Sequence, residues 1–315
     1  TFVLSLSRIS ESGVTHSKIL LIAIQNILSK RECLILLTQS NTTSSPDVVS
    51  QMIYDVWPIK LLPLNKDRRL LTYGKSANAD VRGGISNPSL DFDENIYGTK
   101  NVLESMRLNK VGKIVFASSA TVYGNPQSFP TDEKSQLIQT SIYGASKLAG
   151  EAMIQAYSEY YDIKSWIFRF VSWIGERYTH GVIFDFMCKL SNNSDKLEIL
   201  GNGDQNKSFL YVNDGVKAIL LALKDDGGDK SIYNLGHNYG IRVIDVANII
   251  CDELGLKGVE YSFTGGKSGW KGDSPKVLLN LEKINSIGWF PETSIESGIR
   301  KTVRYLNQNQ NLLNL

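Results

Sequence analysis

The chain has 315 residues, of which 42% are hydrophobic, so it is long enough for two domains and apolar enough to bury a sizeable core. Its formal net charge of +2, with no Lys/Arg block, argues against nucleic acid or a membrane surface as a partner. Three widely spaced cysteines predict a reducing compartment without a disulfide framework, and the three histidines form no metal-ligand spacing with them. These spacings predict no metal site. The sequence has no signal-peptide pattern and no apolar run long enough for a bilayer, so we expect a cytoplasmic protein.

Strands and helices are expected to alternate along the first half of the chain, because continuous apolar runs alternate with segments of helical periodicity. Strands are expected at 1–6, 33–37, 113–118 and 164–170, and helices at 18–29, 95–107 and 143–160. This order is typical of a parallel, doubly wound α/β sheet. After residue 169 the pattern is less regular, with Gly-rich loops at 200–208 and 264–275 around a helix expected at 245–256.

In the segment "SIYGASKLAGEA", Tyr143 precedes Lys147 by four residues, so on a helix the two side chains share one face. A nearby cation lowers the pKa of a phenol, and a tyrosine tuned in this way can act as a general acid/base near neutral pH. The small residues between them leave room for a cofactor. The alternative is a surface helix with an incidental Tyr and Lys, because this spacing alone is common.

Ser118 and Ser119 end the apolar strand expected at 113–118, in the segment "FASSATVYG". Parallel α/β sheets bind their ligands at this end of a strand. A serine hydroxyl there can share a hydrogen bond with a substrate oxygen and the tuned tyrosine. The alternative is a strand-to-loop corner whose hydroxyls cap backbone groups.

Taken together, these segments resemble the extended short-chain dehydrogenase/reductase (NAD-dependent epimerase/dehydratase) family, and within it the UDP-galactose/UDP-glucose 4-epimerase branch. The resemblance runs from about Ser76 to Tyr305 and also includes "DENIYGTKNVLESMR", "ILGNGDQNKSFLYVNDGVKAI" and "FTGGKSGWKGDSPKVLLNLEKINSIGWFP". It implies a Rossmann-type fold with a smaller C-terminal substrate lobe. The NAD-binding domain would span 1–170, with a later return at about 207–238, and the mainly substrate-binding lobe would span 171–315.

The resemblance implies tightly held NAD and epimerisation at C4 of a nucleotide-diphosphate sugar of the UDP-glucose/UDP-galactose type, through a transient 4-keto intermediate. Tyr143 would be the acid/base, Lys147 would lower its pKa and hold the nicotinamide ribose, and Ser119 would assist at the sugar 4-oxygen. The Asp–Glu pair typical of sugar 4,6-dehydratases is missing after Ser119, which argues against dehydration. We also expect a homodimer. The alternatives are another NAD-dependent nucleotide-sugar dehydrogenase or epimerase, or a non-catalytic relative that binds a nucleotide sugar.

Further residues carry over by position. Those expected to contact the cofactor are Ser10, Gly13, His16, Asp55, Ser76, Ala77, Asn95, Ser118, Tyr143, Lys147, Phe170 and Val171. Those expected to contact the substrate are Ser119, Tyr143, Ser172, Lys207, Lys267, Trp270 and Asp273. Lys207 stands where the family has an Arg, so it keeps the charge and loses the bidentate fork, and it could equally be an ordinary surface residue.

The opening of the chain departs from the family. The family begins with a Gly-x-x-Gly-x-x-Gly turn that lets the backbone approach a pyrophosphate. Here Ser10 and His16 flank Gly13, and only two of the 26 glycines precede residue 80. The acidic residue expected after the second strand is also absent. Three accounts follow: a diverged half that has lost tight NAD binding, a rebuilt turn that still binds NAD, or a misread stretch over the first ~75 residues.

Overall fold

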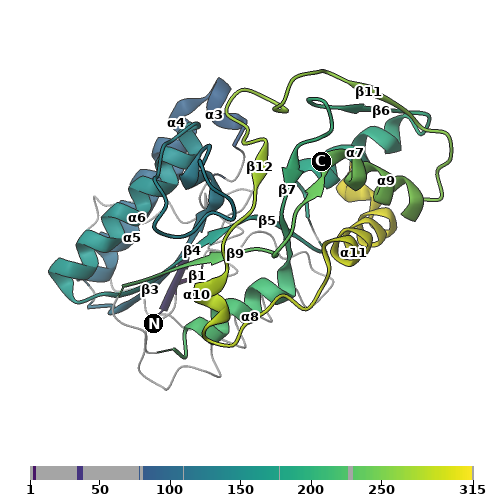
Figure 1. The fold of residues 1–315 in the computed structure, drawn as a ribbon. Coiled ribbons are helices and arrows are strands. Elements are labelled where there is room, and N and C mark those ends of the chain that lie inside the picture. The colour runs from purple at the N-terminus through teal and green to yellow at the C-terminus, as the bar shows by residue number, and fades with distance from the viewer. Residues whose placement is uncertain are drawn as a thin grey trace. The chain divides into compact units, whose positions relative to one another are not determined.

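The structure, a computed structural model, describes residues 78, 81–108, 110–176, 178–225 and 230–313, together with the backbone of 3–4 and 34–37. The chain divides into two compact units, each built from several segments (Figure 1). Unit 1 comprises Thr1–Ser118, Ile142–Phe168 and Asp226–Ile232. Unit 2 comprises Ser119–Ser141, Arg169–Asp225 and Tyr233–Leu315.

A five-stranded sheet has the order β1-β2-β3-β4-β9. Its strands are β1 (Val3–Leu4), β2 (Leu34–Leu37), β3 (Lys113–Ser119), β4 (Lys164–Phe170) and β9 (Lys230–Leu235). β2 pairs in parallel with β1 and with β3, and Leu34 lies opposite Lys113. The central residues of β3 and β4 are buried without alternation, as expected for strands covered on both faces. The predicted doubly wound α/β fold class is therefore confirmed.

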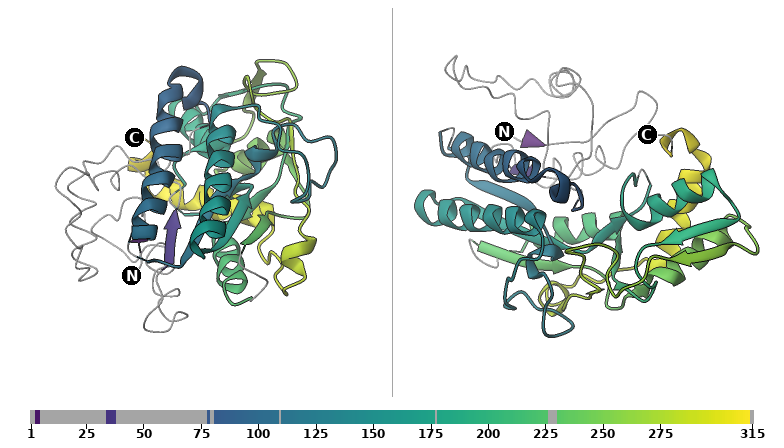
Figure 2. Two further views of the ribbon diagram at one scale, coloured as in Figure 1. Left: turned by 90° about the vertical axis from the view of Figure 1, so that its left-hand side faces the viewer. Right: turned by 90° about the horizontal axis from the view of Figure 1, so that it is seen from above.

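Two of the five helices that the structure describes in unit 1, one spanning Gly98–Leu108 and the other Ile142–Tyr161, bury apolar side chains against β3 of this sheet. The five helices are α3 (Gly83–Ser86), α4 (Pro88–Leu90), the π-helix η2 (Asp91–Tyr97), α5 (Gly98–Leu108) and α6 (Ile142–Tyr161). Leu103 and Met106 of α5 pack with Ile154 of α6 and with Phe116 of β3 in one core cluster. α5 and α6 lie side by side (Figure 2). The sequence predicts one α-helix at 95–107. In the structure this segment begins in the π-helix η2, which ends at Tyr97, and continues as the α-helix α5 from Gly98.

Unit 2 is built from short strands and helices, and three of these helices meet in its core. Its strands are β5 (Ser172–Ile174), β6 (Lys196–Ile199), β7 (Asn206–Lys207), β8 (Phe209–Tyr211), β10 (Ile241–Arg242), β11 (Glu260–Phe263) and β12 (Lys276–Val277). Its helices are η3 (Ala120–Tyr123), α7 (Gly181–Asn192), α8 (Val212–Ala222), α9 (Val243–Glu253), α10 (Glu282–Asn285), α11 (Ile295–Gln308) and η4 (Gln310–Leu312). Phe186 of α7, Ile250 of α9 and Ile299 of α11 meet in its core.

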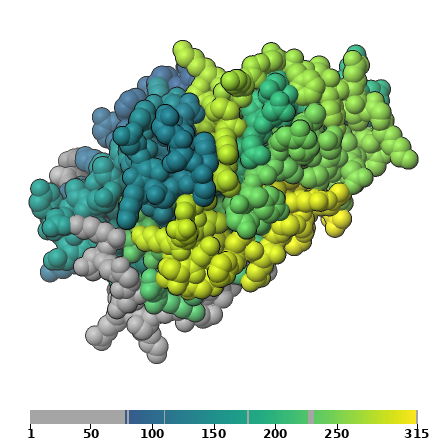
Figure 3. All heavy atoms as spheres, in the orientation of Figure 1, coloured from purple at the N-terminus to yellow at the C-terminus, as the bar shows by residue number. Residues whose placement is uncertain are grey.

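The small sheets of unit 2 carry the loops expected to bind substrate. β7 lies between β10 and β12, β6 pairs with β11, and β5 pairs with β8. The segment 264–274, which leads into β12, lies at the surface and is yellow-green in Figure 3. None of the helices in the described part of the chain is long and apolar enough to cross a bilayer. The helix expected at 18–29 lies outside the described residues.

Candidate functional site

Tyr143 and Lys147 lie on the buried face of α6. The buried residues of this helix recur at helical spacing and include Gly150 and Ile154, so this face packs inward in unit 1. Tyr143 is 2% exposed and Lys147 is 1% exposed. The two side chains therefore do not form an incidental pair on a solvated surface.

The ammonium group of Lys147 is held by β3. Its Nζ donates a hydrogen bond of 3.0 Å to the carbonyl oxygen of Ala117. It lies 5.2 Å from the ring centre of Phe116 and 5.8 Å from the ring centre of Tyr143. A positive charge is thus fixed close to the phenol, which is the arrangement that favours the phenolate form of a tyrosine.

Burial lowers the pKa of Lys147 from 10.5 to about 8, and the nearby Asp91 and Glu151 carboxylates oppose this shift. Both carboxylates are fully buried. Near neutral pH the lysine therefore keeps its proton, but with a much smaller margin than a lysine in water.

A buried polar network joins η2 to α6. Asp91 Oδ1 accepts hydrogen bonds from Asn78 Nδ2 at 2.9 Å and from Asn95 Nδ2 at 3.0 Å. Asn95 Nδ2 also donates to Ser146 Oγ at 2.8 Å, and Ser146 Oγ donates to the carbonyl oxygen of Tyr143 at 2.8 Å. The predicted cofactor residue Asn95 is thereby tied to the turn of α6 that carries Tyr143.

The two serines at the end of β3 have different partners. In unit 1, Ser118 is buried and its Oγ donates a hydrogen bond to Glu151 Oε1. In unit 2, Ser119 caps η3, and its Oγ accepts a 3.2 Å hydrogen bond from the Thr121 N–H. This is the capping role that the sequence left open as an alternative. It does not occupy the proton of the Ser119 hydroxyl.

Three predicted residues lie in unit 2 at the end of β4 and directly after it, namely Phe170, Val171 and Ser172. The Val171 N–H donates to the carbonyl oxygen of Leu235 at 3.0 Å, and the Phe170 ring meets the Trp173 ring edge-on with centres 4.5 Å apart. Ser172 is exposed at the start of β5. These contacts fix the backbone of the segment and leave the Ser172 side chain accessible within its unit.

Lys207 and Asp273, which were both predicted to contact substrate, form an ion pair in unit 2. Lys207 Nζ lies 2.7 Å from Asp273 Oδ1 and also donates to the carbonyl oxygen of Ser274. The two side chains are only 17% and 7% exposed. Burial lowers the pKa of Lys207, and Asp273 opposes this shift. Among the other two predicted residues of this loop, Lys267 is exposed and Trp270 is half-buried.

Six predicted cofactor residues lie outside the described residues, namely Ser10, Gly13, His16, Asp55, Ser76 and Ala77. The buried carboxylates Asp91 and Glu151 are not among the residues that the sequence predicts for the site. A signal was present for Glu151, because it lies one helical turn beyond Lys147. Asp91 likewise precedes Asn95 by four residues.

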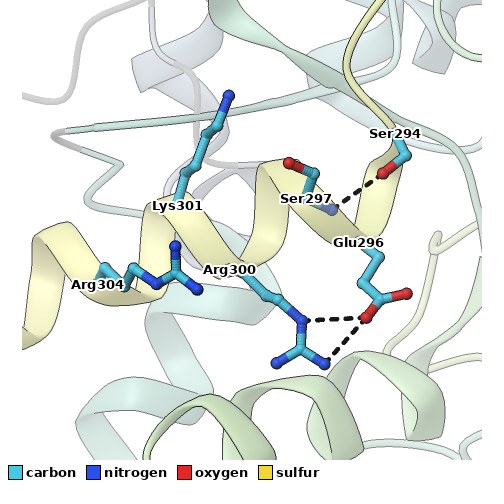
Figure 4. A pocket seen from close by; sticks show the side chains of 6 residues that line it. All are labelled: Ser294, Glu296, Ser297, Arg300, Lys301 and Arg304. Atoms are coloured by element: carbon cyan, nitrogen blue, oxygen red, sulfur yellow. Dashed lines mark hydrogen bonds and ion pairs between the residues drawn. The ribbon is translucent and has the colours of Figure 1, made fainter.

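A separate hollow lies on α11 of unit 2 and is lined by Ser294, Glu296, Ser297, Arg300, Lys301 and Arg304 (Figure 4). The Arg300 guanidinium forms ion pairs of 2.9 Å with Glu296 and 2.7 Å with Asp252. Arg304 pairs with Glu253. Its arginines therefore already have carboxylate partners, and none of the predicted site residues lines it.

Comparison with known proteins gives a consistent picture. The profile described as "NAD dependent epimerase/dehydratase family" matches residues 75–236, slightly more than half of the chain. A Methanocaldococcus jannaschii protein provisionally named UDP-glucose 4-epimerase is 36% identical over 240 residues, which cover 75% of this chain and 76% of that protein. The dTDP-D-glucose 4,6-dehydratase of Homo sapiens is 31% identical over 220 residues, which cover 68% of this chain and 62% of that protein.

Solved structures agree with the fold. A crystal structure of UDP-galactose 4-epimerase is 36% identical with a TM-score of 0.67, and the match covers 74% of this chain and 76% of that one. UDP-glucose 4-epimerase of Thermotoga maritima, crystallised with UDP-glucose, is 23% identical with a TM-score of 0.71 and coverages of 92% and 94%. The second likeness bears on the fold alone.

Proposed function

Because this chain belongs to the NAD-dependent epimerase/dehydratase family, we propose that it epimerises C4 of a UDP-linked sugar of the UDP-glucose/UDP-galactose type. The observation that carries the proposal is the buried pair of Tyr143 and Lys147, a phenol beside a fixed ammonium on one face of α6. The names of the relatives at 36% identity support the choice of sugar nucleotide.

The cofactor of the family is NAD, and the residues of unit 1 suit it. Lys147 uses one of its N–H groups on Ala117, so it retains donors for a ribose hydroxyl. Asn95 Oδ1 is buried and has no hydrogen-bond partner among the described residues. Lys147 lies against Ala117 near the end of β3, where parallel sheets bind nucleotides, and Asn95 is joined to the adjacent Ser146 of α6 by a hydrogen bond. We propose that Lys147 and Asn95 hold the nicotinamide end of NAD.

When bound, NAD supplies a reversible hydride acceptor for C4 of the sugar. Tyr143 removes the proton of the 4-hydroxyl group and returns it after the 4-keto sugar has turned its other face. Lys147 stabilises the phenolate of Tyr143 by its charge. Burial of both side chains excludes water, which strengthens this interaction. Ser119 remains the predicted hydroxyl that assists at the sugar 4-oxygen.

On the substrate side, we propose that Lys207, Lys267, Trp270, Asp273 and Ser172 bind the nucleotide diphosphate or the sugar. The charge of Lys207 supports its role in binding a diphosphate, because its side chain is a cation that is only 17% exposed in unit 2. A diphosphate bound there would share Lys207 with Asp273.

Dehydration is the competing reaction, since a 4,6-dehydratase is among the relatives. In this chain Ala120 and Thr121 follow Ser119, where dehydratases typically carry the acid pair for water elimination. Neither side chain can donate or accept a proton as a carboxyl group does. We therefore favour epimerisation.

We further propose that unit 1 supplies the NAD-binding part and unit 2 the nucleotide-sugar-binding part, as the predicted boundaries at 170 and at about 207–238 suggest. A homodimer and a cytoplasmic location are proposals of the same kind. Light scattering of the purified full chain checks the first of these.

The test is a product analysis with the purified full chain. It is incubated with UDP-glucose, UDP-galactose and dTDP-glucose, and the sugars are identified by NMR while the NAD released on denaturation is quantified. Interconversion of the two UDP-sugars with bound NAD supports the proposal. A 4-keto-6-deoxy product would identify a dehydratase instead, and the absence of both product and NAD would identify a non-catalytic binder.

A further inference from the structure

Asp91 is a carboxylate with no exposure to solvent, at the first residue of η2. A buried carboxylate is costly unless hydrogen bonds or an opposite charge stabilise it. Two side-chain amides, of Asn78 and Asn95, donate to its Oδ1. Gly84 leaves the space for its other oxygen, because a Cβ atom there would lie 2.5 Å from Asp91 Oδ2. The carboxylate is therefore held in a shaped, polar recess.

This recess is connected to the turn of α6 that carries the proposed acid/base. Asn95 Nδ2 bonds at once to Asp91 Oδ1 and to Ser146 Oγ. Ser146 directly precedes Lys147, and its hydroxyl donates to the carbonyl oxygen of Tyr143. The position of Asp91 thus fixes the amide of Asn95, which in turn fixes the backbone between Tyr143 and Lys147.

The charged groups of the described residues that act on Lys147 are two carboxylates. Asp91 reaches it from η2, and Glu151 reaches it from the next turn of α6. β3 contributes the Ala117 carbonyl and the Phe116 ring, neither of which titrates. Tyr143 is the titratable group beside it on α6. Both carboxylates raise the pKa of Lys147 against the lowering by burial, and the effect of Asp91 is the larger.

We propose that Asp91 is a positioning residue that keeps Lys147 protonated near neutral pH and holds the turn from Tyr143 to Lys147 in place. Its effect on the rate rests on the proposed function, whereas its effect on Lys147 does not. Without the Asp91 charge, Lys147 loses its proton at lower pH. The neutral amine no longer stabilises the Tyr143 phenolate, so the reaction slows on the alkaline side.

The experiment follows the titration of Lys147 by NMR in the full chain labelled with ¹³C at lysine Cε, with Lys147→Met identifying the signal. In the unchanged protein we expect a midpoint near the pKa of about 8. In Asp91→Asn we expect it to move down by about one pH unit or more, the usual effect of losing a close opposite charge. The alkaline limb of the pH–rate profile is expected to move with it.

Asp93→Asn is the matched control, because it makes the same change on an exposed side chain of the same helix. Its Lys147 midpoint should equal that of the unchanged protein. If Asp91→Asn does not fold, Asp91→Ser gives the same comparison, since serine is smaller and keeps an oxygen that can accept from an amide. An unmoved midpoint in the folded Asp91 variant, or an equal shift in Asp93→Asn, overturns the proposal. If no sugar is converted but the midpoint shifts as described, the proposed function fails and the inference stands.

Discussion

Lys147 lies with its Nζ 3.0 Å from the carbonyl oxygen of Ala117 and 5.8 Å from the centre of the Tyr143 ring. The first contact anchors the lysine to the sheet, and the second places its charge beside the phenol. A strand of the sheet and a helix packed on it thus define the position of one charge relative to one ring.

Tyr143→Phe removes the phenol oxygen and keeps the ring, which is 2% exposed. We expect epimerisation to slow by roughly a hundredfold or more, the usual scale for a positioned acid/base. The thermal unfolding midpoint should change little. Tyr160→Phe, at a tyrosine of the same helix that is 77% exposed, is the matched control and should keep full activity. An active Tyr143→Phe protein would remove Tyr143 from the proposed chemistry.

Lys147 should make the stability of the protein depend on alkaline pH. Burial lowers its pKa from 10.5 to about 8, so between these values the unfolded chain binds a proton that the folded chain has lost. The free energy of unfolding therefore rises with pH across this window, by about 3 kcal/mol for this shift. Denaturant titrations at the two ends of the window measure it.

Lys147→Met should abolish this contribution, whereas Lys100→Met, at an exposed lysine of α5, should keep it. A slope of stability against pH that is the same in the unchanged protein and in Lys147→Met would contradict the shifted pKa.

Lys207→Met should destabilise unit 2, because it leaves Asp273, which is only 7% exposed, without its cation. Removing one partner of a buried pair typically costs about 3–5 kcal/mol. The double variant Lys207→Met/Asp273→Asn should recover much of this loss. Lys217→Met is the control, since Lys217 and its partner Glu292 are 53% and 68% exposed and such pairs contribute about 1 kcal/mol or less. Denaturant unfolding measures the free energy of unfolding of each variant. If Lys207→Met and Lys217→Met lose the same amount, the Lys207–Asp273 pair is solvated and not buried.

Gly150→Ala should weaken the packing of α6 on β3. A Cβ atom at Gly150 would lie 2.7 Å from Cζ of Phe116, closer than a normal contact. Overpacking of this kind costs about 1–3 kcal/mol and outweighs the gain of about 1 kcal/mol from the higher helix propensity of alanine. Gly112→Ala has no atom within 4 Å of the new Cβ and should be nearly neutral. If denaturant unfolding finds Gly150→Ala as stable as Gly112→Ala, α6 can shift away from the sheet at little cost.

The regular elements around the site could be predicted closely from the sequence. The helix expected at 143–160 is α6, Ile142–Tyr161, and the strands expected at 113–118 and 164–170 are β3 and β4. These elements have strong local signals, namely an uninterrupted helical spacing and continuous apolar runs. Their backbone is determined largely by neighbouring residues in the chain.

Pairings over long distances could not be predicted in the same way. Lys207 and Asp273 are 66 residues apart, and the sequence predicts each as a separate partner of the substrate, not as a pair. The acidic segment 91–97 shows no spacing that distinguishes a π-helix from an α-helix. Asp91 in particular has the sequence character of a solvated residue, and its burial depends on Asn78 and Gly84, which precede it by 13 and 7 residues. Such contacts follow from tertiary packing and not from local pattern.

The division of the chain into interleaved segments has a consequence for its biosynthesis. The chain passes from one unit to the other after Ser118, Ser141, Phe168, Asp225 and Ile232. Domains built from one continuous segment can fold in order as they leave the ribosome. Here unit 1 lacks its last segment until residue 232 has been made, by which time the first two segments of unit 2, about half of its residues, have also been made. A premature stop anywhere before that residue leaves both units incomplete.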